Sequence, residues 1–144
     1  MATVAGSTVT IVGVGTTNIT ASQAGDGTWA AATPVVQALV VAKADQTIRI
    51  SAPRYKLPTD PPFAVTATAS SGLACTLSIL SGPATILNGT VTLTGALGDV
   101  VIRATQAGNA NYNAAADTDR TVSVVEELPV FDAGGLTLSL QLTI

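Results

Sequence analysis

Residues 84–95 read ATILNGTVTLTG, two short runs rich in Thr, Ile, Leu and Val on either side of Asn88-Gly89. Asn and Gly both accept a positive φ, so the pair predicts a two-residue turn between antiparallel strands. The second run alternates cleanly between apolar and polar residues, which is typical of a strand with one buried face. We therefore expect strands at about 84–88 and 90–94.

The same alternation extends outward from this hairpin. On the N-terminal side, residues 63–69 read FAVTATA. On the C-terminal side, the strand at about 100–106 is expected to point Val100, Ile102 and Ala104 into the core. Turn sequences separate the runs. The pattern predicts strands near 47–51, 63–69, 74–80, 84–88, 90–94, 100–106 and 120–125. Seven short strands in about 80 residues is the number found in an immunoglobulin-like sandwich of two packed antiparallel sheets.

The composition excludes several kinds of functional site. The 144 residues include six Lys and Arg, no His and one Cys, with a net charge of −3 and 3% aromatic residues. So few cations and rings argue against nucleic-acid binding. One Cys and no His exclude a zinc site of the usual type and a Ser-His-Asp or Cys-His nucleophile. We expect no enzyme, no cofactor and no metal.

The chain shows no membrane or targeting signal. Residues 61–98 carry no charge, but Ser, Thr, Gly and Pro interrupt them throughout, so no membrane span is expected. The first ten residues contain no basic region and no continuous apolar run, so no signal peptide is visible. The single Cys75 shares the parity of Leu77 and Ile79, and we expect it to be a small buried hydrophobe.

Part of the N-terminal sequence is repeated later in the chain. Residues 21–32 read ASQAGDGTWAAA and residues 104–115 read ATQAGNANYNAA, while 8–13 read TVTIVG and 90–95 read TVTLTG. One inserted residue reconciles the two registers, so the period is roughly 83 residues, as in an array of similar modules. Trp29 then corresponds to Tyr112, and for both we expect a packing or corner role rather than a sugar-stacking platform. Gln106, Asn109, Asn111 and Asn113 are expected to bridge backbone groups in the long connection.

At these residues the chain resembles the tandem immunoglobulin-like repeats of large bacterial surface proteins. It is also similar to the immunoglobulin-like domains of tailed-phage virion proteins. The resemblance rests on the runs QTIRI, PFAVTATASSGLACTLSILSGPATILNGTVTLTG and ATQAGNANYNAA. It covers about 45–125 as a full module and 6–41 as a partial one. It implies a β-sandwich without a catalytic site, used as a spacer, stalk or adhesive unit.

We expect three segments. Residues 1–42 form a partial module that holds only the last three strands, at about 8–12, 17–22 and 35–41. Residues 43–126 form a complete immunoglobulin-like β-sandwich, and 127–144 form a connector and a C-terminal assembly strand. Three strands cannot close a two-sheet core, so the apolar face of the partial module must be covered.

The C-terminal strand offers a candidate cover. Residues 136–144 read LTLSLQLTI, with five large apolar residues on one face: Leu136, Leu138, Leu140, Leu142 and Ile144. Burying each is worth roughly 1.5–3 kcal/mol, and an exposed edge of this kind would aggregate. Our hypothesis is that this strand and the partial module are completed by each other or by strands of neighbouring chains. The alternative is a fragment with a frayed N-terminus.

The remaining candidate sites are weaker. The basic and aromatic cluster Arg54-Tyr55-Lys56, on a predicted loop, is the candidate contact surface. Asp26-Gly27 and Asp117-Thr118-Asp119 offer oxygens to Ca²⁺, but no full loop pattern is present, and we favour turn-capping roles. An isopeptide crosslink from a Lys to an Asn is a further alternative with no distinctive marker. Its candidate members are Lys43, Lys56, Asn109 and Asn113.

These patterns predict a non-enzymatic structural protein. We expect a subunit of a phage virion or another extracellular particle or filament, held by inter-chain β-strand pairing, with weak contacts to glycans or a cell envelope. The absence of a visible signal peptide favours the virion. The alternative is a passive spacer or adhesive immunoglobulin-like repeat of a bacterial cell-surface protein. An accessory module of a carbohydrate-active enzyme is disfavoured, because aromatic platforms and paired carboxylates are lacking.

Overall fold

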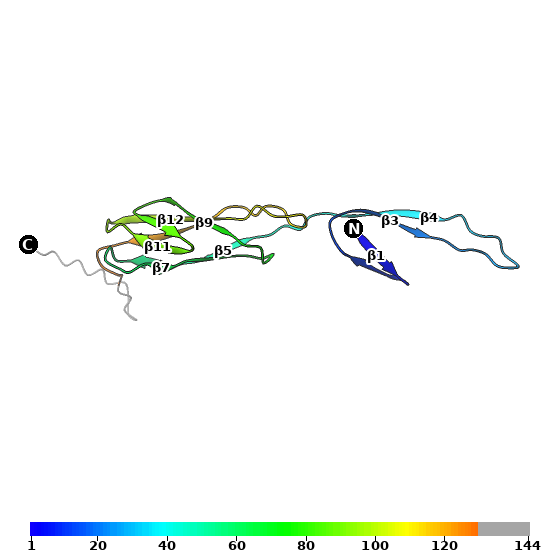
Figure 1. Cartoon of the computed structure of the whole chain (residues 1–144), viewed down its shortest axis with the longest axis horizontal. Coiled ribbons are helices and arrows are strands. Elements are labelled where there is room, and N and C mark those ends of the chain that lie inside the picture. Colours follow the sequence, from blue (N-terminus) through cyan, green and yellow to red (C-terminus); the bar gives the residue numbers. More distant parts are fainter. Residues whose placement is uncertain (130–144) are drawn as a thin grey trace, which may run out of the picture. The chain divides into compact units, whose positions relative to one another are not determined.

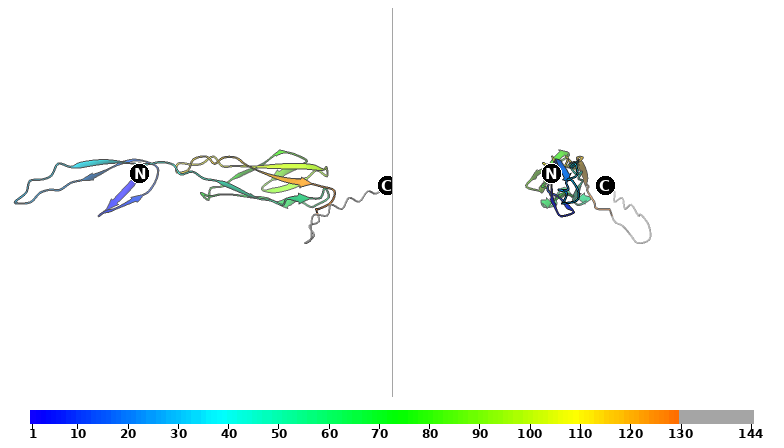
Figure 2. Two further views of the ribbon diagram at one scale, coloured as in Figure 1. Left: turned by 180° about the vertical axis from the view of Figure 1, so that it is seen from behind. Right: turned by 90° about the vertical axis from the view of Figure 1, so that its right-hand side faces the viewer.

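The computed structural model describes residues 1–129, which form thirteen β-strands and no helix (Figure 1). These residues fall into two compact units. Unit 1 contains residues 1–46 together with 107–114, and unit 2 contains residues 47–106 and those that follow residue 114. The expected assembly strand at 136–144 lies outside the described residues. Figure 2 shows the strands of both units from two further sides.

Unit 2 contains three sheets that together form a sandwich-like arrangement. The four-stranded sheet has the order β6 (Tyr55–Lys56), β13 (Thr118–Val124), β12 (Gly98–Thr105) and β9 (Thr76–Ser81). The three-stranded sheet has the order β10 (Ala84–Leu87), β11 (Thr90–Leu93) and β7 (Phe63–Ala64). A third sheet pairs β5 (Ile48–Ser51) with β8 (Thr66–Ala69). The prediction of an all-β, sandwich-like fold is therefore confirmed.

The core of unit 2 draws apolar side chains from these sheets. Its largest fully buried members are Ile102, Val91, Val100 and Val122. Val91 comes from the three-stranded sheet and the others from the four-stranded sheet, and Ile50 of β5 packs against the same cluster. The predicted inward set of Val100, Ile102 and Ala104 is confirmed, since all three are fully buried. Alternation therefore identified the face that the sheets bury.

The turn at Asn88-Gly89 joins β10 to β11, as predicted. Both residues have positive φ, 49° and 76°. Leu87 pairs directly with Thr90, so the turn contains two residues. Positive φ at both central positions is the signature of the turn that matches the twist of a hairpin.

The predicted single strand at 63–69 is wrong. The chain forms β7 and β8 instead, and these two strands belong to different sheets. Val65 lies between them, is buried, and donates its backbone N–H to the carbonyl oxygen of Gly89 at 2.7 Å. The alternation continues through Val65 because its side chain still enters the core, while the backbone changes its pairing partner.

The predicted loop at Arg54-Tyr55-Lys56 is also wrong at two of its positions. Tyr55 and Lys56 form β6, which pairs with β13 in parallel, so the sheets are not wholly antiparallel. Ser123 and Val125 donate backbone N–H groups to the carbonyl oxygens of Arg54 and Lys56, at 3.0 and 2.9 Å. The partner strand lies far along the sequence, and for this reason no local pattern marks β6.

Unit 1 contains two hairpins. One pairs β1 (Ala2–Ala5) with β2 (Thr8–Ile11), and the other pairs β3 (Gly15–Ala21) with β4 (Val35–Val41). The prediction of three strands is therefore corrected to four. The missed strand, β1, has the short sequence ATVA before the turn at Gly6, where φ is 60°.

The registers of unit 1 repeat those of unit 2. The β1–β2 hairpin runs from Ala2 opposite Ile11 to Ala5 opposite Thr8, as β10–β11 runs from Ala84 opposite Leu93 to Leu87 opposite Thr90. The β3–β4 ladder has the same register as the β12–β13 ladder, and each contains seven pairs. Gly15 and Gly98, which begin β3 and β12, have φ of 134° and 133°. Unit 1 thus repeats the last four strands of unit 2.

Candidate functional site

Unit 1 leaves uncovered the side chains that unit 2 buries. Val9 occupies the position of Val91, and 41% of Val9 is exposed while Val91 is fully buried. Three further positions are half-buried in unit 1 and buried in unit 2: Ile19, Leu39 and Val41, equivalent to Ile102, Val122 and Val124. We call Val9, Ile19, Leu39 and Val41 the open face of unit 1. The strands of unit 2 that cover the equivalent positions have no counterpart among residues 1–46.

A second apolar face lies on the other side of β4. Val36 and Val40 are exposed, and they occupy the positions of Asp119 and Ser123 in β13. Alternate residues of a strand point to opposite faces, so β4 carries apolar side chains on both. We call Val36 and Val40 the outer face of β4. A strand that is apolar on both faces is typical of one buried between two layers.

The exposed large apolar residues of the described chain gather in the same unit. Nine of thirteen belong to residues 1–46, and the only buried side chain of that segment is the polar Gln46. The nine are Met1, Val4, Val9, Ile11, Val12, Trp29, Val35, Val36 and Val40. Exposed apolar residues at this density are typical of interaction sites in soluble proteins.

A second candidate surface is the loop that joins β12 to β13. This loop holds the extended segment Ala44–Gln46 by backbone pairing. The Ala44 N–H donates to the Asn111 carbonyl oxygen, and the Asn113 N–H donates to the Ala44 carbonyl oxygen, both at 2.9 Å. Ala44 and Tyr112 form a parallel bridge. The loop therefore binds this segment as an added strand.

Side chains complete the docking of this segment. Gln46, 7% exposed, donates its Nε2 hydrogen to the Asn113 carbonyl oxygen at 2.7 Å. The Asn113 side chain donates from Nδ2 to Asp45 Oδ1 at 2.8 Å. The expected bonding to backbone groups is confirmed for Asn109, whose Oδ1 accepts the N–H groups of Asn111 and Tyr112 at 2.8 and 3.0 Å. The Asn113 side chain bonds a carboxylate instead. Sequence reasoning missed the docked segment, because pairing between distant residues leaves no local pattern.

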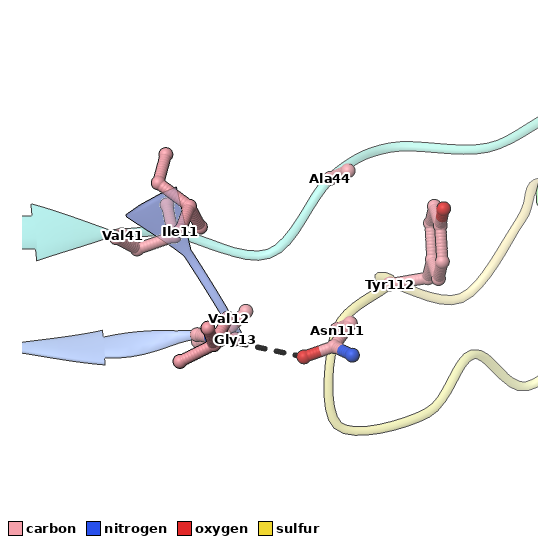
Figure 3. A pocket seen from close by; sticks show the side chains of 9 residues that line it. Ile11, Val12, Gly13, Val41, Ala44, Asn111 and Tyr112 are labelled. Carbon is pink, nitrogen blue, oxygen red and sulfur yellow. Dashed lines mark hydrogen bonds between the residues drawn. The ribbon is translucent and has the colours of Figure 1, made fainter. Parts of the chain in front are cut away.

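A small hollow of about 260 Å³ lies beside this loop within unit 1. Its lining is mostly apolar and includes Ile11, Val12, Val41 and Tyr112. Figure 3 shows the Asn111 side-chain oxygen directed at the backbone next to Gly13, where it accepts the Val14 N–H at 3.4 Å. Among the residues that line the hollow, the Tyr112 phenol is the one ionisable side chain, and no second titratable group stands beside it in the lining.

The three residues of the predicted contact surface have different surroundings. Lys56 lies with Nζ 3.3 Å from Asp60 Oδ2 and 5.2 Å from the centre of the Phe63 ring. A backbone N–H from Leu57, and then Lys56 itself, hold the pKa of Asp60 below its ordinary value. Arg54 and Tyr55 line a polar hollow of about 400 Å³ with residues of β13.

The candidate acidic residues have partners within the protein. Asp26 Oδ1 accepts the N–H groups of Thr28 and Trp29, both at 2.8 Å, and these bonds hold its pKa below the ordinary value of 3.8. Its predicted capping role is confirmed. Asp119 lies within β13 and accepts two bonds of 2.8 Å from Arg103, so the turn-capping role predicted for it is wrong. Asp117 Oδ2 lies 3.6 Å from the same guanidinium. The bonds from Arg103 hold the pKa of Asp119 below its ordinary value. Among residues 1–129, no cluster of three metal-ligating side chains occurs.

Two further predictions have different outcomes. Cys75 is half-buried with the inward parity of Leu77, as expected, although it is not fully enclosed. Trp29, in contrast, is 73% exposed, so the packing role predicted for it is wrong. Its equivalent Tyr112 is half-buried beside the docked Ala44. Among residues 1–129, no segment pairs with the first loop as Ala44 pairs with the second.

No family model, curated protein or solved structure matches this chain. Among the described residues there is no helix with the length and apolar character required to span a membrane.

Proposed function

We propose that the chain is a non-enzymatic structural protein with an immunoglobulin-like module, acting as a subunit of a phage virion or another extracellular particle or filament. In this proposal neighbouring chains are held together by β-strand pairing. The observation that carries it is the open face of unit 1. In the described residues Val9 is exposed and the other three members are half-buried, whereas the equivalent positions of unit 2 are buried. Complete burial of an exposed side chain of this size is worth about 1.5–3 kcal/mol, and a partner that covers the open face gains the share that belongs to the surface still exposed.

The outer face of β4 favours assembly over a simple spacer. A missing half of a sandwich would cover only the open face and leave Val36 and Val40 in water, whereas Asp119 and Ser123 stand at these positions in unit 2. Neighbouring chains packed on both sides would bury both faces. We propose that the alternating strand with Leu136, Leu138, Leu140, Leu142 and Ile144, from a neighbouring chain, supplies one of these covers.

The decisive experiment is the molar mass of the purified chain, measured by light scattering on a sizing column over a range of concentrations. We expect a discrete multimer or an ordered polymer. A single species of 14.3 kDa at every concentration would overturn the proposal. That outcome would favour the passive spacer or adhesive repeat, which the duplicated strand registers also suit.

Paired variants identify the surfaces involved. Leu140→Glu places a charge in the apolar set of the strand predicted from the sequence of residues 136–144, and Gln141→Glu places the same charge in its polar set. We expect Leu140→Glu to reduce the molar mass and Gln141→Glu to leave it unchanged. For the outer face of β4, we expect Val36→Thr with Val40→Thr to weaken assembly. We expect Leu87→Thr, at an apolar residue of unit 2 that is even more exposed, to have no effect. Equal effects within either pair would argue against the assigned face.

A further inference from the structure

The loop that joins β3 to β4 has the same internal bonding as the loop that holds Ala44–Gln46. In the first loop the Ala32 N–H donates to the Gln23 carbonyl oxygen at 3.0 Å, and the Asp26 N–H donates to the Trp29 carbonyl oxygen at 2.9 Å. In the second loop Ala115 donates to Gln106 at 2.9 Å, and Asn109 donates to Tyr112 at 3.0 Å. The two sets of donors and acceptors are equivalent under the repeat.

The two loops also have a glycine with the same backbone conformation at equivalent positions. Gly25 and Gly108 have φ of 74° and 76°. A Cβ at either position would lie 2.4 Å from a carbonyl oxygen, that of Trp29 in one loop and that of Tyr112 in the other. Only glycine fits such a close approach at positive φ. Asp26 Oδ1 and Asn109 Oδ1 accept equivalent pairs of backbone N–H groups. The first loop is therefore built as a second copy of a strand-docking loop.

The first loop lacks the segment that the second one holds. Thr28 and Ala30 are equivalent to Asn111 and Asn113, whose carbonyl and N–H groups bind Ala44. Both residues are exposed, and in the described part of the chain the Thr28 carbonyl and the Ala30 N–H bind no segment of this kind. Trp29 is exposed beside them. The Thr28 carbonyl and the Ala30 N–H, two residues apart, are therefore placed to pair with the backbone of an added strand.

We propose that residues 23–32 form a docking site for an extended peptide segment with the pattern Ala-x-Gln, supplied by a partner chain. The occupant of the equivalent loop defines this chemistry: a small residue pairs with the backbone, and a Gln two residues later donates to a loop carbonyl. The loop has no preference for the residue between Ala and Gln. Ala30 has no side-chain amide, whereas Asn113 uses its amide to bind Asp45. The Ala44–Gln46 segment of a second copy is not the expected occupant, because its own loop already holds it. The proposal is independent of the multimeric state.

The test uses Trp29, the only tryptophan of the chain, as an internal reporter. The probe is a synthetic peptide with the sequence of residues 41–48, VAKADQTI, titrated into the intact chain. We expect a saturable change in Trp29 emission, and a selective shift of the Ala30 amide resonance in a nitrogen-labelled sample. The Gln46→Ala peptide should bind about tenfold more weakly, since it lacks the side-chain bond. The Asp45→Ala peptide should bind as well as the original.

Two glycine variants provide the matched control. Gly25→Ala introduces the 2.4 Å contact at positive φ, whereas a Cβ at Gly27 meets nothing within 4 Å. We expect Gly25→Ala to weaken peptide binding at least about tenfold and Gly27→Ala to change it by less than about twofold. The proposal is overturned by no response to the peptide, by equal binding of a scrambled peptide, or by equal effects of the two variants. It is also overturned if raising the concentration of the chain alone shifts the Ala30 amide as the peptide does and Gly25→Ala removes that shift, because a second copy would then be the occupant.

Discussion

Asp26 and Asn109 hold equivalent loops with different chemistry. Both side chains accept two backbone N–H groups, but only Asp26 carries a titratable charge. The N–H groups of Thr28 and Trp29 lower the pKa of Asp26 from 3.8, so the charged carboxylate stabilises the loop above that pH. The contribution is lost as the pH falls through the lower value that the folded loop imposes.

We therefore expect acid to open the first loop before the second. The emission of Trp29 should change as the pH falls below 3.8, the ordinary value for the Asp26 carboxyl. The Asp26→Asn variant should bind the same two amides without titrating, and its emission should not change over that range. Far-ultraviolet circular dichroism, recorded on the same samples, reports whether the sheets remain folded. An identical acid transition in wild type and Asp26→Asn would show that another group controls it.

The glycine of the hairpin turn supports a second prediction at the residue scale. Gly89 and Gly72 both have positive φ, but an added Cβ would lie 3.0 Å from the Val65 carbonyl oxygen only at Gly89. Both Ala variants incur the left-handed backbone cost of about 1–2 kcal/mol. We expect Gly89→Ala to lower the free energy of unfolding in urea further than Gly72→Ala does. Equal losses would mean that the turn moves away from Val65 without cost.

At the scale of elements, the β12–β13 pair supplies most of the core of unit 2. Ile102 is fully buried among side chains of both sheets. We expect Ile102→Ala to lower the free energy of unfolding by about 2–5 kcal/mol, through lost burial and a cavity. Leu87→Ala, at a residue that is 75% exposed, should change it by less than about 0.5 kcal/mol. Urea unfolding followed by circular dichroism measures both, and a small loss at Ile102 would place the core elsewhere.

Local signals explain which elements could be predicted from the sequence. The hairpin at Asn88-Gly89 and the inward set of β12 follow from turn chemistry and alternation, which act between near neighbours. The parallel strand β6 and the break at Val65 depend on partners far along the chain, namely Ser123 and Gly89. The docking of Ala44 on the Asn111 loop depends on the same kind of long-range pairing, so the candidate docking site became visible only when the two loops could be compared.

At the scale of the whole molecule, the two units contain similar ladders with different cover. The β3–β4 and β12–β13 ladders have the same register, but only the second lies against a buried core. Backbone pairing alone resists local opening poorly when the adjoining apolar face is uncovered. In dilute solution we expect amides of β3 and β4 to exchange with deuterium at least about tenfold faster than those of β12 and β13, which corresponds to about 1.4 kcal/mol of opening free energy.

The dependence of hydrogen exchange on protein concentration distinguishes assembly with neighbouring chains from the spacer alternative. If neighbouring chains cover the open face and the outer face of β4, the protection of β3 and β4 rises with protein concentration, because association stabilises only the assembled form. The protection of β12 and β13 should not change, since their core lies within one chain. Hydrogen exchange is measured by mass spectrometry at two protein concentrations, and each measurement reports the protection of both strand pairs. Low protection in β3 and β4 at every concentration would mean that copies of this chain do not cover unit 1, and the spacer alternative would then be preferred.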